Sequence, residues 1–341
     1  MLTIHVGAGK CGSSAIQEAL TARPVFKGED GRRWTYAAID GKGVLRSGTA
    51  IAEDPRRLVK SALFRQLSKR EALPLDALRD GLHALDGPIL SNEGQINDLQ
   101  GGQWLLEALD MPVHVVAYVR PQVDYVNSAW WQWGAWSEMP RQDWIEQRIK
   151  RALWGDILRR WQAIPQVRQV TVRLLPREVV SDVFGLFGAE PSSGEAAPRR
   201  SNVTLSGTLL RLLQRHPALR ATFGKEIDFE LSKLLARFGH PGDRAPTPWV
   251  IGPDLAQRIL SRTAASNRVL LSMLDPDSAA RMSGDPRWWE AGAYADRAVE
   301  PFDPPAPADS ELDALAAILL EAQLRGLRRK RPGRPSREPA Q

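Results

Sequence analysis

Cysteine is nearly absent from this chain, because Cys11 is the only one among 341 residues. A single cysteine forms no internal disulfide. Together with five dispersed histidines it offers no cluster of the kind that holds zinc. We therefore expect a protein of a reducing compartment, with the cytoplasm as the simplest assignment, and no bound metal.

Long apolar runs are missing as well. No stretch approaches the roughly 18 consecutive apolar residues that a membrane-spanning helix needs. The chain opens at Leu2 within an apolar run of strand character, so we expect neither a secretory signal nor a membrane anchor. At 341 residues with 43% hydrophobic content, the chain can bury a large core, which excludes a small peptide-like scaffold.

Acidic residues are absent from one window near the C-terminus, and this window explains the net charge of +6 and the pI near 9.7. Its seven basic residues are Arg325, Arg328, Arg329, Lys330, Arg331, Arg334 and Arg337. Without these seven, 39 basic residues face 40 acidic ones, so the rest of the chain is close to neutral. We expect residues 325–341 to form a disordered, solvated tail that can touch an anionic polymer or a membrane surface. Nucleic acid is not expected as a partner, although residues 330–335 loosely resemble a minor-groove hook.

The start of the chain carries the strongest motif. An apolar run from Leu2 to Val6 breaks into a turn before a helical pattern begins, and the small and polar residues there are Gly7, Gly9, Lys10, Gly12, Ser13 and Ser14. Glycines let the backbone approach an anion closely, N–H groups at a helix N-terminus point at it, and lysine adds a mobile positive charge. The sequence therefore predicts a strand, a phosphate-binding loop and a helix start, with a nucleotide carrying several phosphates as the ligand.

The position of the lysine helps to separate three interpretations of this loop. In the P-loop of nucleoside triphosphatases the lysine follows the last glycine, whereas Lys10 precedes Gly12. The three glycines fit the dinucleotide fingerprint G-x-G-x-x-G, but that motif needs a second strand ending in an acidic residue about 20 residues on. Residues 24–33 are turn-rich and polar with no convincing strand, so Glu29 and Asp30 are weak candidates. A tight turn without a ligand is the third interpretation.

The spacing Gly7-x-x-Lys10-x-Gly12-Ser13-Ser14 resembles the 5′-phosphosulfate loop of sulfotransferases that use 3′-phosphoadenosine 5′-phosphosulfate (PAPS). The pattern in that family is G-x-x-K-[TS]-G-[TS]-[TS]. The resemblance implies that these residues, with Gly9, bind PAPS, that Lys10 stabilises charge on the leaving phosphate, and that no metal is required. Cys11 stands where the family often has a hydroxyl residue. A thiolate is one option at a helix N-terminus, and a small filler is the preferred one.

A second motif lies some 110 residues further on. Val113 to Val119 is apolar with β-branched residues, Arg120 ends the run, Pro121 suits a helix start, and Ser128 follows Arg120 by eight residues. Such a strand, arginine and serine resemble the family's 3′-phosphate site, which implies that Arg120 and Ser128 bind this phosphate. Independently of the resemblance, an arginine at the carboxyl end of a buried strand projects into the crevice where open α/β sheets bind ligands. A surface arginine and a solvated serine are the alternative.

Glu93 is the candidate catalytic base. It ends the apolar run that begins at Gly87, and the Leu-Ser-x-Glu sequence there is similar to a segment of many bacterial sulfotransferases. A carboxylate at this place can accept the proton of an acceptor hydroxyl. Two other roles stay open, since Glu93 can also begin the next helix or bind a neighbouring arginine.

Two further sets of residues are assigned less directly. Trp130, Trp133 and Trp136 share a face of the helix expected after Ser128, where they can pack in the core or, as the less favoured option, floor an acceptor groove. Animal cytosolic sulfotransferases contact the 3′-phosphate through an Arg-Lys-Gly loop, which this chain lacks. Arg200, beside Arg199, is the nearest substitute.

Strands that alternate with helices, and that carry ligand motifs at their ends, predict an α/β fold with a central parallel β-sheet flanked by helices and a helical C-terminal portion. We expect one domain over 1–324, with a helical lobe over roughly 205–324, followed by the tail. The predicted function is transfer of a sulfuryl group from PAPS to a hydroxyl, or as a second choice an amine, of an acceptor such as a carbohydrate. The alternatives are an NAD(P)-dependent dehydrogenase and a non-catalytic nucleotide-binding protein.

Overall fold

The computed structural model describes residues 1–40, 43–54, 59, 61, 74–190, 207–215, 247–302 and 316. The chain divides into two units. One consists of Met1–Asn202 and Ile251–Arg297, and the other of Val203–Val250 and Ala298–Gln341. The first unit contains the sheet and both sequence motifs, so the site is built from this unit alone.

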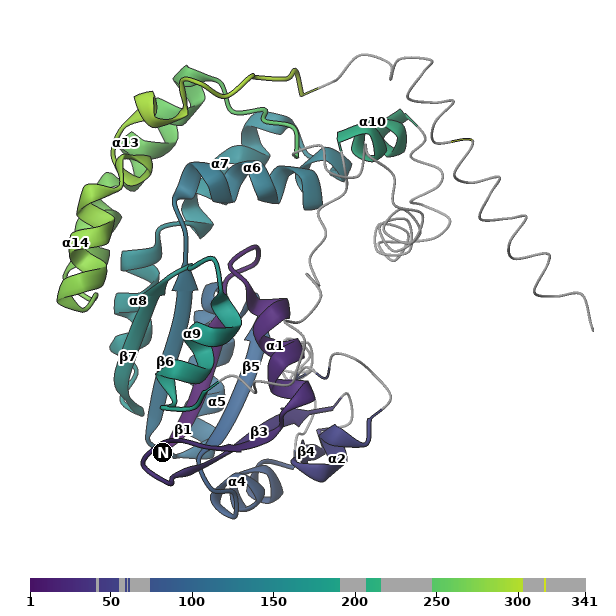
Figure 1. The fold of residues 1–341 in the computed structure, drawn as a ribbon, viewed down its shortest axis with the longest axis vertical. Coiled ribbons are helices and arrows are strands. Elements are labelled where there is room, and N and C mark those ends of the chain that lie inside the picture. Colours follow the sequence, from purple (N-terminus) through teal and green to yellow (C-terminus); the bar gives the residue numbers. More distant parts are fainter. Residues whose placement is uncertain are drawn as a thin grey trace, which may run out of the picture. The chain divides into compact units, whose positions relative to one another are not determined.

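The described part of the first unit forms a seven-stranded sheet (Figure 1). Its strands are β1 (Leu2–Gly7), β2 (Val25–Lys27), β3 (Arg33–Ile39), β4 (Leu45–Ser47), β5 (Pro88–Glu93), β6 (Val113–Val119) and β7 (Val167–Leu174). The order is β2-β3-β5-β1-β6-β7, with β4 paired to β3. All pairs from β3 to β7 are parallel, and only β2 and β4 run antiparallel to β3. The predicted α/β fold around a mainly parallel sheet is confirmed.

Helices cover both faces of this sheet (Figure 1). The helices of the first unit are α1 (Ser13–Ala22), α2 (Thr49–Ala52), α4 (Leu75–His83), α5 (Leu99–Leu109), α6 (Gln122–Gln132), α7 (Arg141–Arg151), α8 (Trp154–Gln162), α9 (Val179–Leu186), α13 (Pro253–Leu271) and α14 (Pro276–Gly284). Short 3-10 turns are η1 (Gln95–Asn97), η2 (Gly134–Trp136), η4 (Pro286–Trp288) and η5 (Ala291–Tyr294). Helices α1 and α9 lie on one face, and α5 and α8 lie on the other. Within the described ranges, every helix is too short or too polar to cross a bilayer.

The second unit is described in three short pieces and at the single residue 316. They include α10 (Gly207–Arg215) and the bridge between Trp249 and Val299. The Arg211 guanidinium pairs with the Glu300 carboxylate at 2.7 Å, and the Glu300 amide donates to the Trp249 carbonyl at 2.7 Å. The boundaries of the predicted helical lobe stay a prediction, because much of 205–324 lies outside the described residues.

The place of β2 bears on the dinucleotide interpretation. The sequence predicted no strand over 24–33, and this is wrong, since Val25–Lys27 forms β2. This strand lies at the sheet edge, antiparallel to β3, while β1 is flanked by β5 and β6. A dinucleotide-binding βαβ unit requires the strand after the loop and helix to return parallel to the first one. Glu29 and Asp30 instead lie in the turn between β2 and β3, so the dinucleotide fingerprint lacks its second half.

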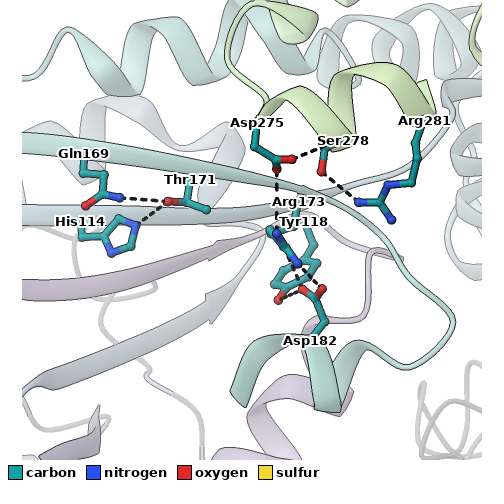
Figure 2. Close-up of polar contacts among 9 residues, drawn as sticks. All are labelled: His114, Tyr118, Gln169, Thr171, Arg173, Asp182, Asp275, Ser278 and Arg281. Carbon is teal, nitrogen blue, oxygen red and sulfur yellow. Dashed lines mark hydrogen bonds and ion pairs between the residues drawn. The ribbon is translucent and has the colours of Figure 1, made fainter. Parts of the chain in front are cut away.

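A charged cluster ties α9 to the sheet (Figure 2). The Tyr118 hydroxyl of β6 donates to the Asp182 carboxylate of α9 at 2.7 Å, and the Arg173 guanidinium of β7 forms two hydrogen bonds with the same carboxylate. Burial and the adjacent Asp182 both raise the pKa of Tyr118. Asp275, the N-cap of α14, lies 4.0 Å from Arg173 and accepts a hydrogen bond from the Ser278 amide at 2.9 Å. Asp182 is therefore the centre of this cluster, and Asp275 is at its edge.

Replacing Asp182 by Asn should destabilise the fold by about 1–3 kcal/mol, since it removes the charged acceptor of Arg173 and Tyr118. Asp275→Asn is the matched control and should change the free energy of unfolding by less than about 0.5 kcal/mol, because asparagine remains a good N-cap and the half-exposed ion pair contributes little. Urea unfolding followed by circular dichroism measures both. Equal losses in the two variants would contradict this ranking.

Candidate functional site

The predicted phosphate loop is a tight turn between β1 and α1. Gly12 precedes α1 with φ of 84°, and Lys10 also has a positive φ, 65°. The Cys11 amide donates to the Ala8 carbonyl at 3.2 Å, and the Ser13 hydroxyl donates to the same oxygen at 3.1 Å. A left-handed conformation costs a residue other than glycine roughly 1–2 kcal/mol, so the turn is maintained by its surroundings.

Side chains from the turn itself and from two other parts of the chain lie close to its glycines. A Cβ atom added at Gly7 would collide with the Ser13 hydroxyl, and one at Gly9 would lie 2.6 Å from Cη2 of Trp133. At Gly12 an added Cβ would lie 3.0 Å from Cδ1 of Leu175. Each glycine therefore meets a packing requirement of the protein itself, in addition to the anion-binding role that the sequence suggests.

The second predicted motif lies directly beside this turn. Arg120 follows β6, Pro121 is the N-cap of α6, and Ser128 lies within that helix. The Arg120 guanidinium donates from Nη1 to the Lys10 carbonyl at 3.3 Å and to the Ser128 Oγ at 3.5 Å. The physical reason is the sheet order, because β1 and β6 are parallel neighbours and their carboxyl ends meet at one edge. The two motifs, 110 residues apart, form one cluster.

Hydrogen bonds with α8 and α13 hold the backbone around Arg120. Its carbonyl accepts a hydrogen bond from the Trp154 indole at 3.0 Å. Gln122, at the start of α6, donates to the Asn267 side chain of α13 at 2.5 Å. The guanidinium is half-buried, and among the described residues no carboxylate lies within ion-pair distance of it. A partly buried cation of this kind favours an anionic ligand.

Glu93 reaches the same edge of the sheet from the other side of β1. It is the last residue of β5 and the register partner of Gly7, and the Gly94 amide donates to the Gly7 carbonyl at 2.7 Å. Its carboxylate and the Arg120 guanidinium both act on the Cys11 thiol, with opposite effects on the pKa of that thiol. Glu93 at the end of β5 and Arg120 after β6 thus lie beside the turn that contains Lys10.

Cys11 is fully buried under this cluster. Burial raises the pKa of its thiol to about 12, and the nearby Arg120 lowers it only in part. The thiol therefore stays protonated at neutral pH, which supports the interpretation of Cys11 as a small filler rather than a reactive thiolate.

The tryptophan stripe is divided by the end of the helix. The sequence predicted Trp130, Trp133 and Trp136 on one helix, and this is wrong: α6 ends at Gln132, Trp133 is its C-cap, and Trp136 belongs to η2. Trp130 and Trp131 are buried in the core. Trp133 is half-buried and reaches Gly9 in the turn, so it is the one member of the predicted stripe placed at the site.

Arg148 of α7 is a site neighbour that sequence reasoning missed. Its guanidinium lies over the rings of Trp133 and Trp144, 4.9 Å from each centroid. In the sequence it is one of several basic residues at the end of a helix, so no local signal separates it from a solvated arginine. The predicted Arg200, its neighbour Arg199 and the tail 325–341 lie outside the described residues.

No protein-family profile matches the sequence, and no curated protein shows significant similarity to it. Among solved structures, the chain resembles a sulfotransferase from Alicyclobacillus acidocaldarius, with 14% sequence identity and a TM-score of 0.38. That alignment covers 82% of this chain and 98% of the other. At this level of identity and superposition, the likeness assigns no activity to the chain.

The burial of Cys11 predicts that iodoacetamide leaves it unmodified in the native protein at pH 8, because both access and the thiolate fraction are minimal. Mass spectrometry after a one-hour incubation measures the modified fraction. The same treatment in concentrated urea is the control and should give full modification. Rapid alkylation of the native protein would show that the turn opens readily.

Proposed function

We propose that this chain is a sulfotransferase that moves a sulfuryl group from PAPS to a hydroxyl of an acceptor such as a carbohydrate, with an amine as the second choice. The observation that carries the proposal is the Arg120 guanidinium, which contacts both the Lys10 carbonyl and the Ser128 hydroxyl. This contact supports the proposal because it joins the two motifs that the sequence predicts to bind anions.

The residues present fit a nucleotide that bears phosphates on both its 3′ and 5′ positions. Arg120 has no carboxylate partner among the described residues, and its planar fork suits a phosphate. With Ser128 it would hold the 3′-phosphate. Around the turn, Lys10, Ser14 and the backbone amides near Gly12 would hold the 5′-phosphosulfate, while Gly7, Gly9 and Ser13 shape the turn.

The chemistry assigned to the chain is a displacement at sulfur. The acceptor oxygen forms a bond to sulfur as the bond from sulfur to the 5′-phosphate oxygen breaks. Glu93 would accept the proton of the acceptor hydroxyl. Lys10 and the turn amides would stabilise the negative charge that develops on the departing 5′-phosphate. Arg200 stays a candidate for a further contact to the 3′-phosphate.

Ligand-induced stabilisation tests the nucleotide assignment. Adenosine 3′,5′-bisphosphate should raise the melting temperature of the protein, and Arg120→Ala should lower its affinity by roughly tenfold to a hundredfold, because a charge-assisted hydrogen bond is lost. Arg159→Ala, an exposed change on α8, is the matched control and should leave the affinity unchanged. Stabilisation by NADH and not by the bisphosphate would favour a dehydrogenase and overturn the proposal.

Kinetics with sulfur-labelled PAPS and a broad panel of hydroxyl acceptors test the catalytic roles. Lys10→Ala should lower kcat by about 10²-fold or more, as loss of an electrostatic stabiliser does. Glu93→Gln should lower kcat by about 10²- to 10⁴-fold and leave the bisphosphate Kd unchanged, because a general base does not touch the nucleotide. If the wild-type protein binds the bisphosphate but transfers label to no acceptor, it is a binding protein and not an enzyme.

A further inference from the structure

Arg148 stacks against two tryptophan rings beside the proposed site. Its guanidinium lies 4.9 Å from the ring centroid of Trp133 and 4.9 Å from that of Trp144. It also lies near the Tyr125 hydroxyl, whose pKa is raised by burial and lowered in part by this guanidinium. Contacts with two rings restrict the direction of a side chain that is otherwise long and mobile.

Trp133 contacts both Arg148 and the turn after β1. The edge of its indole ring lies so close to Gly9 that a Cβ at Gly9 would be 2.6 Å from Cη2. Gly9 directly precedes Lys10, whose ammonium is assigned to the 5′-phosphosulfate. Trp133 therefore packs against the residue that precedes Lys10, and Arg148 stacks against that same Trp133 ring.

The charge of Arg148 is unmatched within the part of the chain that the structure describes. No carboxylate there lies within 4.0 Å of the guanidinium. The one glutamate of α7, Glu146, is engaged elsewhere, by Arg258 at 3.8 Å and Arg262 at 3.3 Å. A guanidinium has five N–H donors, and a half-buried one without an acidic partner has donors left for a ligand.

We propose that Trp133 and Arg148 form an acceptor subsite, in which Arg148 binds a carboxylate or sulfate group of an acidic acceptor and the ring of Trp133 packs against the acceptor. The proposal rests on the function proposed above and names the class of its second substrate. Arg120 and Ser128 already account for the 3′-phosphate, and Lys10 accounts for the 5′ end, so Arg148 is left for a group that the nucleotide does not carry.

A matched pair of ligands tests this subsite. Para-nitrophenyl β-D-glucuronide and para-nitrophenyl β-D-glucoside differ only at carbon 6, which is a carboxylate in the first and a hydroxymethyl group in the second. Each is titrated by calorimetry into protein saturated with adenosine 3′,5′-bisphosphate. The wild-type protein should bind the glucuronide at least about tenfold more tightly, the size of one charge-assisted hydrogen bond. Arg148→Gln should abolish this preference. Lys150→Gln removes the same charge from an exposed position of the same helix and should retain it.

Several outcomes would overturn the subsite. They are equal binding of the two glycosides by the wild-type protein, binding of neither at millimolar concentration, and a preference that survives Arg148→Gln. A merely structural role of Arg148 would lower the melting temperature without changing the ratio of the two affinities. A loss of bisphosphate affinity in Arg148→Gln with the glycoside ratio unchanged would place Arg148 at the nucleotide instead.

Failure of the function proposed above is measured separately, by titrating the bisphosphate alone into the wild-type protein. If the bisphosphate does not bind, the assignment of PAPS fails. The two glycosides are then titrated without nucleotide, and their affinity ratio in wild-type and Arg148→Gln protein still decides whether Arg148 is an anion-binding residue.

Discussion

The parallel pairing of β1 between β5 and β6 is the constraint on which the rest of the site depends. Neighbouring parallel strands end at the same edge of a sheet. The residues at the end of each strand, and those directly after it, therefore come together there. In this chain those groups are the glycine turn after β1, Glu93 at the end of β5 and Arg120 after β6. Lys10, Glu93 and Arg120, from three distant parts of the sequence, thereby come to one edge of the sheet.

Packing then fixes the turn before any ligand arrives. Trp133 closes on Gly9, Leu175 and Val179 lie against Gly12, and the Arg120 guanidinium donates to the Lys10 carbonyl. These contacts come from separate elements, so the turn cannot relax toward one of them without losing another. If the turn binds an anion as proposed, it would lose little conformational entropy on binding, because it is already ordered.

The sequence was sufficient to place the candidate residues that depend on strand ends. Strands at Leu2–Gly7, Pro88–Glu93 and Val113–Val119 are visible as apolar runs, and polar residues at their carboxyl ends follow the general rule for α/β sheets. It was not sufficient where a helix ends without a clear signal. The run of tryptophans continues past Gln132 with unchanged composition, and only the backbone shows that α6 stops there. Arg148 could not be singled out either, because its contacts with the rings of Trp133 and Trp144 arise only in the folded protein.

The conformation of Lys10 has a consequence for how this turn can change. Its φ of 65° lies in the region that glycine occupies at no cost and that other residues occupy at a penalty of roughly 1–2 kcal/mol. Glycine at this position would suit the backbone better and would remove the ammonium group. The backbone conformation and the proposed chemistry therefore favour different residues at this position. A selection for more stable variants of the protein would favour Lys10→Gly, which would abolish the proposed activity.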